Sequence, residues 1–386
     1  MISTRYFFVQ KLTFAIVGID IMSKTRKHLI KNPIILYSLI AFSGFHLILV
    51  IHFASMHLTD FEELTDSFPL LCQLVLCLCK MMIFLRKAKE ILPLIQQIHK
   101  LNIRGKGEEL KIVERENAKD NFLCSLYLRL VITSGSSALL HPILNAIYIY
   151  LTRQEVVLQP PNKATYFWNI SLLADYSLLY ILNIFTVYYV CVVSLAIDTL
   201  FSWFVSNVVA QFHIIGYRFK KTALIYNTDR KQIIKSIIKY HCQTLQLAEH
   251  LNRVYSEMIF LKFTIVCIEI CSLVFRVSRP SDSMGEVAYK CLFLAAVALQ
   301  LILYCYNGQR VRDESAHVAT VIYCTFDWSN VCASYKNLLF VALMRSQKSI
   351  NIKCAFFEVD LSLYLWVFKT AWSLIAALKT LDENQD

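Results

Sequence analysis

The sequence predicts an all-α membrane protein with seven transmembrane helices, a cytoplasmic N-terminus, an extracellular C-terminus and an intracellular helical anchor region. Two observations carry this prediction: apolar blocks of membrane-spanning length alternate with polar gaps, and Lys and Arg gather in every second gap. A bilayer core requires about 20 apolar residues per helix. Seven blocks approach or exceed that length, at residues 33–53, 68–85, 122–151, 170–209, 257–275, 287–306 and 354–381.

The distribution of Lys and Arg gives the orientation of these helices. Residues 1–32 carry six of them, 86–119 nine, 218–253 eight and 310–353 six, whereas the intervening gaps and the C-terminal tail together carry six. Loops rich in Lys and Arg stay in the cytoplasm. The N-terminus is therefore predicted inside and the C-terminus outside, which is the inverse of a G-protein-coupled receptor.

The segments between the spans also have predicted structure. Apolar residues recur at helical spacing within gaps 86–121 and 212–256, so each gap is expected to extend the neighbouring transmembrane helices into the cytoplasm. The apolar stretch 333–344 is too short to cross a bilayer and is predicted to be a buried helix. Apolar stripes outside the bilayer need a partner, which suggests a packed intracellular domain and an oligomer contact.

These elements divide the chain into four parts in order. A cytoplasmic segment, 1–32, includes an amphipathic stretch at 6–19 that lacks the cleavage site of a signal peptide. Transmembrane helices one to six with their long extensions occupy 33–307. Residues 308–353 form an intracellular segment with the short anchor helix, and 354–381 form the last transmembrane helix.

Composition excludes several classes of protein. With 56% hydrophobic and 17% charged residues, the chain is neither a water-soluble domain nor a low-complexity sequence. Its net charge of +11 is spread over the inner gaps without a nucleic-acid motif, so anionic membrane lipid, and no nucleic acid, is the expected partner. None of the thirteen cysteines falls in an outer gap, which predicts no structural disulfide.

Motifs for catalysis and metal binding are missing. The sequence contains no HExxH, GxSxG, GxxxxGK[ST] or GxGxxG, so no enzyme activity and no cofactor are expected. His241 and His250 would lie on different faces of a helix, and no metal site is predicted. Neither internal repeats nor paired broken helices are visible, which disfavours a secondary transporter.

Charged residues within the apolar blocks are candidates for function, because each is costly at the centre of a membrane helix. Arg129 and Lys262 lie near inner ends of spans, where snorkelling to the interface would explain them. The deeper Asp198 and Glu269 should face the bundle interior. The last block has two acids at its inner start and one base near its middle, which fits either a cation pathway or an ion pair between subunits. These residues are Glu358, Asp360 and Lys369.

The outer halves of the second, third, fourth and sixth spans are aromatic and aliphatic with scattered polar groups. Such a wall suits a small, mostly apolar ligand oriented by one or two hydrogen bonds, although aromatic belts at the membrane interface have a similar composition. The candidate ligand-binding residues are Phe68, Cys72, His141, Asn145, Tyr148, Tyr176, Tyr180, Tyr289 and Phe293. A glycosylation sequon begins at Asn169 in a predicted outer gap.

Three stretches carry a family resemblance: HCQTLQLAEHLNRVYSEMIFLKFTIVCIEICSLVF (241–275), FDWSNVCASYKNLLFVALMRSQKSINI (326–352) and FFEVDLSLYLWVFKTAWSLIAALKTL (356–381). Together they resemble the insect odorant receptor family, which has this inverted seven-span topology. The resemblance implies a non-selective cation channel in the plasma membrane of olfactory neurons, gated by a volatile odorant. It also implies a heterotetramer with the odorant co-receptor.

The resemblance assigns the last helix to the pore lining. Glu358, Asp360 and Lys369 would then lie along the pore, and a narrowing near the outside would fall at Ala377, Thr380 and Leu381. The chain departs from the family at residues 370–373, where Thr, Ala, Trp and Ser replace a tyrosine-rich stretch. A gustatory receptor-type channel is the alternative, followed by a G-protein-coupled receptor or a transporter.

Overall fold

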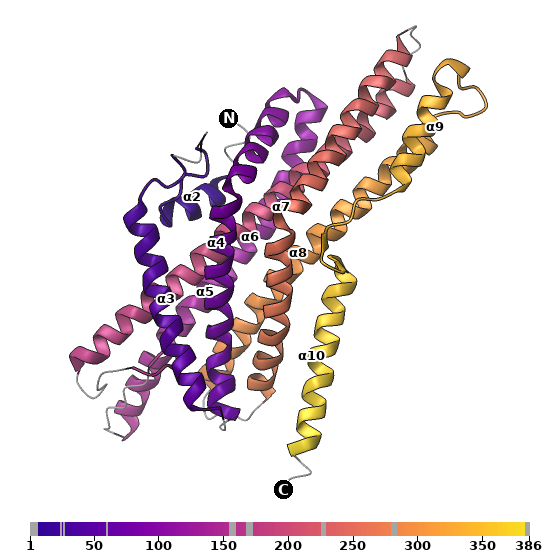
Figure 1. Ribbon diagram of the computed structural model, residues 1–386. Helices are drawn as coiled ribbons and strands as arrows, with labels where there is room; N and C mark the ends of the chain where they lie inside the picture. Colours follow the sequence, from indigo (N-terminus) through magenta and orange to yellow (C-terminus); the bar gives the residue numbers. More distant parts are fainter. Residues whose placement is uncertain are drawn as a thin grey trace.

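The protein is a tilted bundle of long α-helices (Figure 1). The computed structural model describes residues 7–382 except 24, 26–27, 59–60, 154–159, 167–172, 225–228 and 279–283. The helices are α2 (Phe8–Ile16), α3 (Pro33–Met56), α4 (Phe61–Arg104), α5 (Glu108–Arg153), α6 (Leu173–Ala223), α7 (Arg230–Ser278), α8 (Met284–Thr325), α9 (Ala333–Gln347) and α10 (Leu361–Asp382). Two short strands, β1 (Lys353–Cys354) and β2 (Phe357–Glu358), form an antiparallel pair.

Within the described residues, six helices, α3 to α8, are long and apolar enough to cross a membrane. They contain the first six predicted spans, which confirms the predicted class of all-α, multi-pass membrane protein. Helix α4 has 44 residues and is therefore about 66 Å long at 1.5 Å per residue, twice the thickness of a hydrocarbon core. Helices of this length continue far beyond the bilayer.

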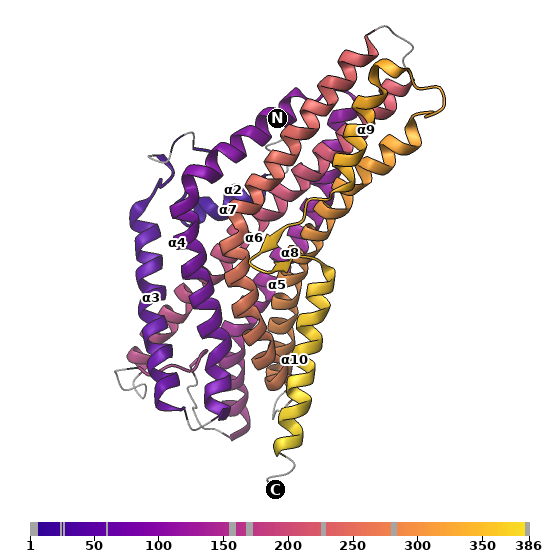
Figure 2. The same cartoon turned by 45° about the vertical axis from the view of Figure 1, so that its right-hand side comes forward.

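The helix ends fall into two groups at opposite ends of the bundle (Figures 1 and 2). Helices α4, α6 and α8 end at one end of the bundle, where α5 and α7 begin and α9 lies. Helices α3, α7 and α10 end at the other, where α4 and α8 begin. The first group holds the basic gaps of the sequence, so we call it the inner end and the second group the outer end.

Helix α6 is the centre of the fold. Every residue from Val192 to Phe212 is buried, and α6 contacts all of the other long helices as well as α2 and α3. A helix that is apolar almost all round is expected in such a position. Helix α2 lies against it, where the ring of Phe7 meets Trp203 edge-on at 4.6 Å and Gln10 Nε2 donates to the carbonyl of Thr199 at 3.1 Å.

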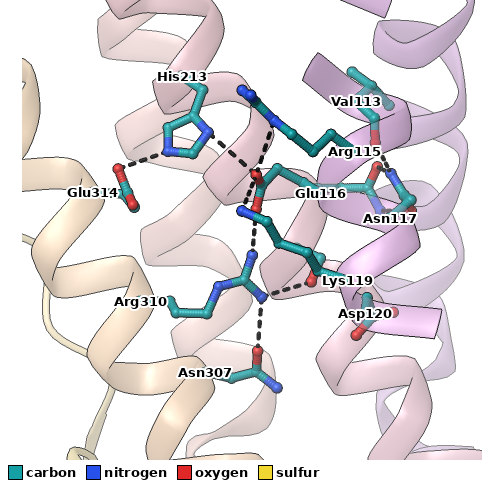
Figure 3. A network of polar contacts seen from close by, with 12 residues as sticks. Val113, Arg115, Glu116, Asn117, Lys119, Asp120, His213, Asn307, Arg310 and Glu314 are labelled. Atoms are coloured by element: carbon teal, nitrogen blue, oxygen red, sulfur yellow. Dashed lines mark hydrogen bonds and ion pairs between the residues drawn. The ribbon is translucent and has the colours of Figure 1, made fainter. Parts of the chain in front are cut away.

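A buried carboxylate joins α5, α6 and α8 toward the inner end (Figure 3). Glu116 is 1% exposed and accepts from Arg310 Nη2 at 2.7 Å and from Lys119 Nζ at 2.7 Å. His213 lies between Glu116, at 3.6 Å, and Glu314, at 2.7 Å. These contacts hold the three helical extensions together outside the apolar core.

The last predicted span begins differently from the prediction. Residues 354–358, predicted to be helical, belong instead to the β1–β2 hairpin, and helix α10 starts only at Leu361. The reason is Asp360, whose Oδ1 accepts from the backbone N–H of Leu363 at 2.9 Å and so caps the helix. Ala355 at the turn has φ of 49°, which a continuous helix would not allow.

Helix α10 packs against the bundle with one face only. Val367 and Ala371 are buried against α7 and α8, and in Figure 1 the helix stands at the side of the bundle. Large apolar side chains on its other faces are exposed, among them Leu365, Trp366 and Trp372. The helix therefore presents an apolar surface that the rest of this chain does not cover.

Candidate functional site

A cavity of about 590 Å³ lies between helices α4, α5, α6, α7 and α8 in the outer half of the bundle. It extends along α8 from Glu286 to Gln300, which is about 21 Å at the helical rise. The segment 160–163 contributes to its outer mouth, and Tyr127, Ser194 and Gln300 lie at its inner floor. The cavity is thus a deep pocket that reaches into the membrane-spanning part of the fold.

Five of the nine residues predicted to bind a ligand line this cavity: His141, Asn145, Tyr148, Tyr289 and Phe293. They come from two helices, α5 and α8, that are far apart in sequence. The rings of His141 and Tyr289 lie 6.2 Å apart, as do those of Tyr289 and Phe293. These rings form one aromatic wall.

The other four predicted residues lie outside the cavity. On α4, Pro69, Leu70 and Gln73 line it, so Phe68 and Cys72 fall on other faces of that helix. On α6, the hydroxyl of Tyr180 donates to the carbonyl of Leu139, and the ring of Tyr176 lies 5.7 Å from that of Tyr180. Hydropathy identified the correct helices here, but it could not give their rotation about their own axes.

Two glycines allow the helices that line the cavity to lie close together. A Cβ on Gly135 of α5 would lie 2.9 Å from Sγ of Cys191 on α6, and both residues line the cavity. A Cβ on Gly285 of α8 would lie 3.3 Å from Cδ2 of His141. Larger residues at either position would push the helices apart or fill the cavity.

Paired charges surround the outer mouth. Asp66 accepts from Arg276 Nε at 2.9 Å and lies 3.0 Å from Nζ of Lys163, which also lies 2.8 Å from Glu63. Burial lowers the pKa of Lys163, but hydrogen bonds to Glu63 and Asp66 outweigh it, so the pKa lies above its ordinary value. The mouth is therefore charged but internally compensated.

A network of buried charges lies behind the floor of the cavity, centred on Asp198 of α6. Its carboxylate accepts from Lys80 Nζ at 2.5 Å and from the hydroxyl of Tyr304 at 2.6 Å. Tyr127 OH donates to it at 3.0 Å and Gln300 Nε2 at 2.5 Å. Asp198 is fully buried, as predicted for an interior-facing acid.

Two further charges complete this network. Lys262 was predicted to snorkel to the interface, but it is fully buried and donates to Oε1 of Gln300. The prediction for Lys262 was wrong because the side chain faces α8 inside the bundle. Glu269 is buried as predicted and accepts from Nε2 of Gln73 at 2.7 Å. Four polar residues of this region were not predicted: Gln73, Tyr127, Ser194 and Gln300. The charges on neighbouring spans indicate that polar partners must lie nearby.

Three residues assigned to the pore, Glu358, Asp360 and Lys369, do not line this cavity. Glu358 pairs with Lys353 at 2.9 Å within the hairpin, and Asp360 pairs with Arg312 of α8 at 2.8 Å, so both acids have partners within the chain. Lys369 is exposed on α10. The side chains of Ala377, Thr380 and Leu381, like Asn169, lie outside the described part of the molecule. Among the described residues, no three His, Cys, Asp or Glu side chains are grouped to hold a metal ion.

Comparison with known proteins identifies the family. A family model described as 7tm Odorant receptor matches residues 60–372, which is most of the chain. The chain belongs to the odorant receptor family. The receptor is 28% identical to odorant receptor 45a of Drosophila melanogaster over 381 residues, which cover 98% of this chain and 99% of that one. It is 25% identical to odorant receptor 9a of the same species, over 96% of this chain and 95% of that protein.

The fold of the receptor is also similar to a solved structure. The insect olfactory receptor OR5 from Machilis hrabei, in complex with eugenol, superposes with a TM-score of 0.81 at 13% identity. The match covers 98% of this chain and 97% of that one. A second structure of OR5 from Machilis hrabei gives the same TM-score of 0.81. The receptor thus shares its whole architecture, α10 included, with an olfactory receptor.

Proposed function

We propose that this receptor binds a small volatile odorant and opens a non-selective cation channel in the plasma membrane, as one subunit of a heterotetramer with the odorant co-receptor of the family. This proposal rests on the cavity that α4, α5, α6, α7 and α8 line. Its volume of about 590 Å³ lies within the usual range of sites for small molecules, about 300–1,000 Å³. An aromatic wall and a few polar groups are what a small, mostly apolar ligand requires.

The similarity to OR5 supports a small molecule as the ligand. That protein was solved in complex with eugenol, a small aromatic compound, in a fold that matches this one over nearly its full length. Here the rings of His141, Tyr289 and Phe293 offer a surface for an aromatic or aliphatic body. Binding would shift the population from a closed to an open state.

Uncovered apolar surfaces support assembly with other subunits. Helix α10 exposes Leu365, Trp366 and Trp372, and α9 exposes Phe340 and Met344 at the inner end. Apolar side chains exposed outside the bilayer, as on α9, mark contacts with protein partners, whereas those of α10 face either lipid or a neighbouring subunit. We assign α9 to the intracellular anchor between subunits and α10 to the lining of the pore.

The proposal is tested by electrical recording in cells that express the receptor with and without the co-receptor. We expect inward cation currents on application of odorants only when both subunits are present, with similar permeability to Na⁺ and K⁺. A panel of esters, alcohols, acids and amines covers the ligand chemistry. Surface expression of both subunits without any current across this panel would overturn the proposal.

Removing one ring from the cavity should weaken odorant binding. Truncation of Phe293 to Ala removes apolar contact worth about 1.5–3 kcal/mol, which corresponds to an increase in EC50 of about 10-fold or more. The maximal current should stay close to that of the wild type, because α10 is untouched. Phe122→Ala, on an exposed position of α5 outside the cavity, is the matched control. An unchanged EC50 for Phe293→Ala would place the ligand elsewhere.

A substitution at the proposed gate should change the current without odorant rather than the EC50 of the odorant. Leu381 falls where the family narrows the pore, so Leu381→Ala is expected to raise the basal conductance more than it changes odorant potency. Leak current without odorant and EC50 with odorant, both normalised to surface expression, separate the two effects. A shift in potency at constant basal conductance would remove Leu381 from the gate.

A further inference from the structure

The floor of the cavity has a fixed pattern of hydrogen-bonding groups, which the charged network behind it imposes. Tyr127 and Gln300 line the cavity and also bind Asp198. The other two partners of this carboxylate, Lys80 and Tyr304, do not line the cavity. Tyr127 and Gln300 therefore stand between the ligand space and the buried charges.

Because Tyr127 and Gln300 are already bonded to this network, each can offer a ligand only one kind of hydrogen bond. Tyr127 donates its only hydroxyl hydrogen to Asp198, so its oxygen can only accept a hydrogen bond from the cavity. The amide oxygen of Gln300 accepts from Lys262 and one of its two N–H groups donates to Asp198. The orientation of this amide is fixed, because only its oxygen can face an ammonium and only its nitrogen can face a carboxylate. Its second N–H remains as a donor.

We infer that Tyr127 and Gln300 form a subsite for a hydroxyl group, so that this receptor prefers neutral alcohols or phenols over the corresponding ethers. This inference rests on the proposed odorant-binding function of the cavity. A hydroxyl donates to Tyr127 and accepts from Gln300 at the same time, whereas an ether, ester or ketone oxygen can only accept. The apolar body of the odorant then extends from the floor toward the aromatic wall.

The surroundings of the subsite restrict the ligand further. Tyr127 is 1% exposed, Gln300 3% and Ser194 4%, so only a small part of each floor residue is open to the cavity. Asp198 already has Lys80 as its counter-ion at 2.5 Å, and a second cation near it would displace one of its four donors. A charged ammonium or carboxylate on the ligand would have to give up its hydration without gaining a free counter-ion, which is costly in a buried site.

The test compares each alcohol with its methyl ether in cells that express the receptor and the co-receptor. Suitable pairs are 2-phenylethanol and 1-octanol with their methyl ethers, since each pair keeps the apolar body constant. We expect the EC50 of the alcohol to be about 10-fold or more below that of the ether. Tyr127→Phe should raise the EC50 of the alcohols about 10-fold and leave that of the ethers nearly unchanged.

Tyr304→Phe is the matched control, because it also removes one tyrosine hydroxyl from Asp198 but lies outside the cavity lining. Tyr304→Phe should leave the ratio of the ether EC50 to the alcohol EC50 unchanged. Equal effects of both variants on alcohols and ethers would mean that Tyr127 only supports the fold, and would overturn the subsite. If Tyr127→Phe does not reach the cell surface, the ratio of the ether EC50 to the alcohol EC50 in the wild-type receptor tests the subsite. Equal EC50 values of alcohol and ether also overturn it. Absence of any odorant-evoked current would instead reject the proposed function itself.

Discussion

Replacing Asp198 with Asn is expected to prevent the receptor from folding stably. The substitution leaves the ammonium of Lys80, 2.5 Å from the carboxylate and fully buried, without its counter-ion. Breaking a buried ion pair by removing one partner costs about 3–5 kcal/mol, a large share of the about 5–15 kcal/mol that holds a typical protein folded. Surface labelling in cells and thermal unfolding of the detergent-solubilised receptor would measure the loss.

Two variants make this experiment specific. Lys80→Met combined with Asp198→Asn removes both charges, so it should recover a substantial part of the lost surface expression. Asp66→Asn at the cavity mouth is the same change in a carboxylate whose side chain is 30% exposed, where an ion pair is worth at most about 1 kcal/mol. Wild-type stability of Asp198→Asn, or no recovery in the double variant, would show that the charge of Lys80 is compensated in another way.

The positions of the spans could be predicted from the sequence because lipid imposes both length and apolarity on a membrane helix. The basic gaps predicted the sidedness, and the helical spacing of apolar residues in gap 86–121 predicted helical extensions of the neighbouring spans. In the structure α4 runs to Arg104 and α5 begins at Glu108. The extended block at 170–209 became the most buried helix of the bundle, α6. All of these features depend on properties of single segments.

Features that depend on how segments meet could not be predicted in the same way. A hydropathy pattern does not fix the rotation of a long helix, so Gln73 was missed and its neighbour Cys72 was chosen. Lys262 was placed at the interface because its partner Gln300 lies on a different helix. The early start predicted for the last span has a similar cause, since residues 354–358 are apolar enough for a helix but pair with each other in a hairpin.

The contact between α8 and the residues just before α10 depends on a single glycine. Replacing this glycine is expected to disturb the packing of α10 against the bundle. A Cβ at Gly308 of α8 would lie 1.9 Å from the carbonyl oxygen of Val359, two residues before α10 begins. This oxygen belongs to the backbone, so the clash cannot be relieved by turning a side chain. Val359 is also held by its N–H, which donates to the carbonyl of Ile352 at 2.8 Å.

Gly308→Ala must therefore displace the hairpin and the first turn of α10, and with them the ion pair between Arg312 and Asp360 at 2.8 Å. Overpacking of this kind costs about 1–3 kcal/mol when side chains can adjust and more when they cannot. If α10 lines the pore, the odorant-evoked current per receptor at the surface should fall at least about 10-fold. Gly44→Ala on α3 is the matched control, because nothing lies within 4 Å of the added Cβ and alanine favours a helix over glycine. Normal currents from Gly308→Ala would mean that α10 can shift at its start without effect on conduction, and the channel would then have to open through another element.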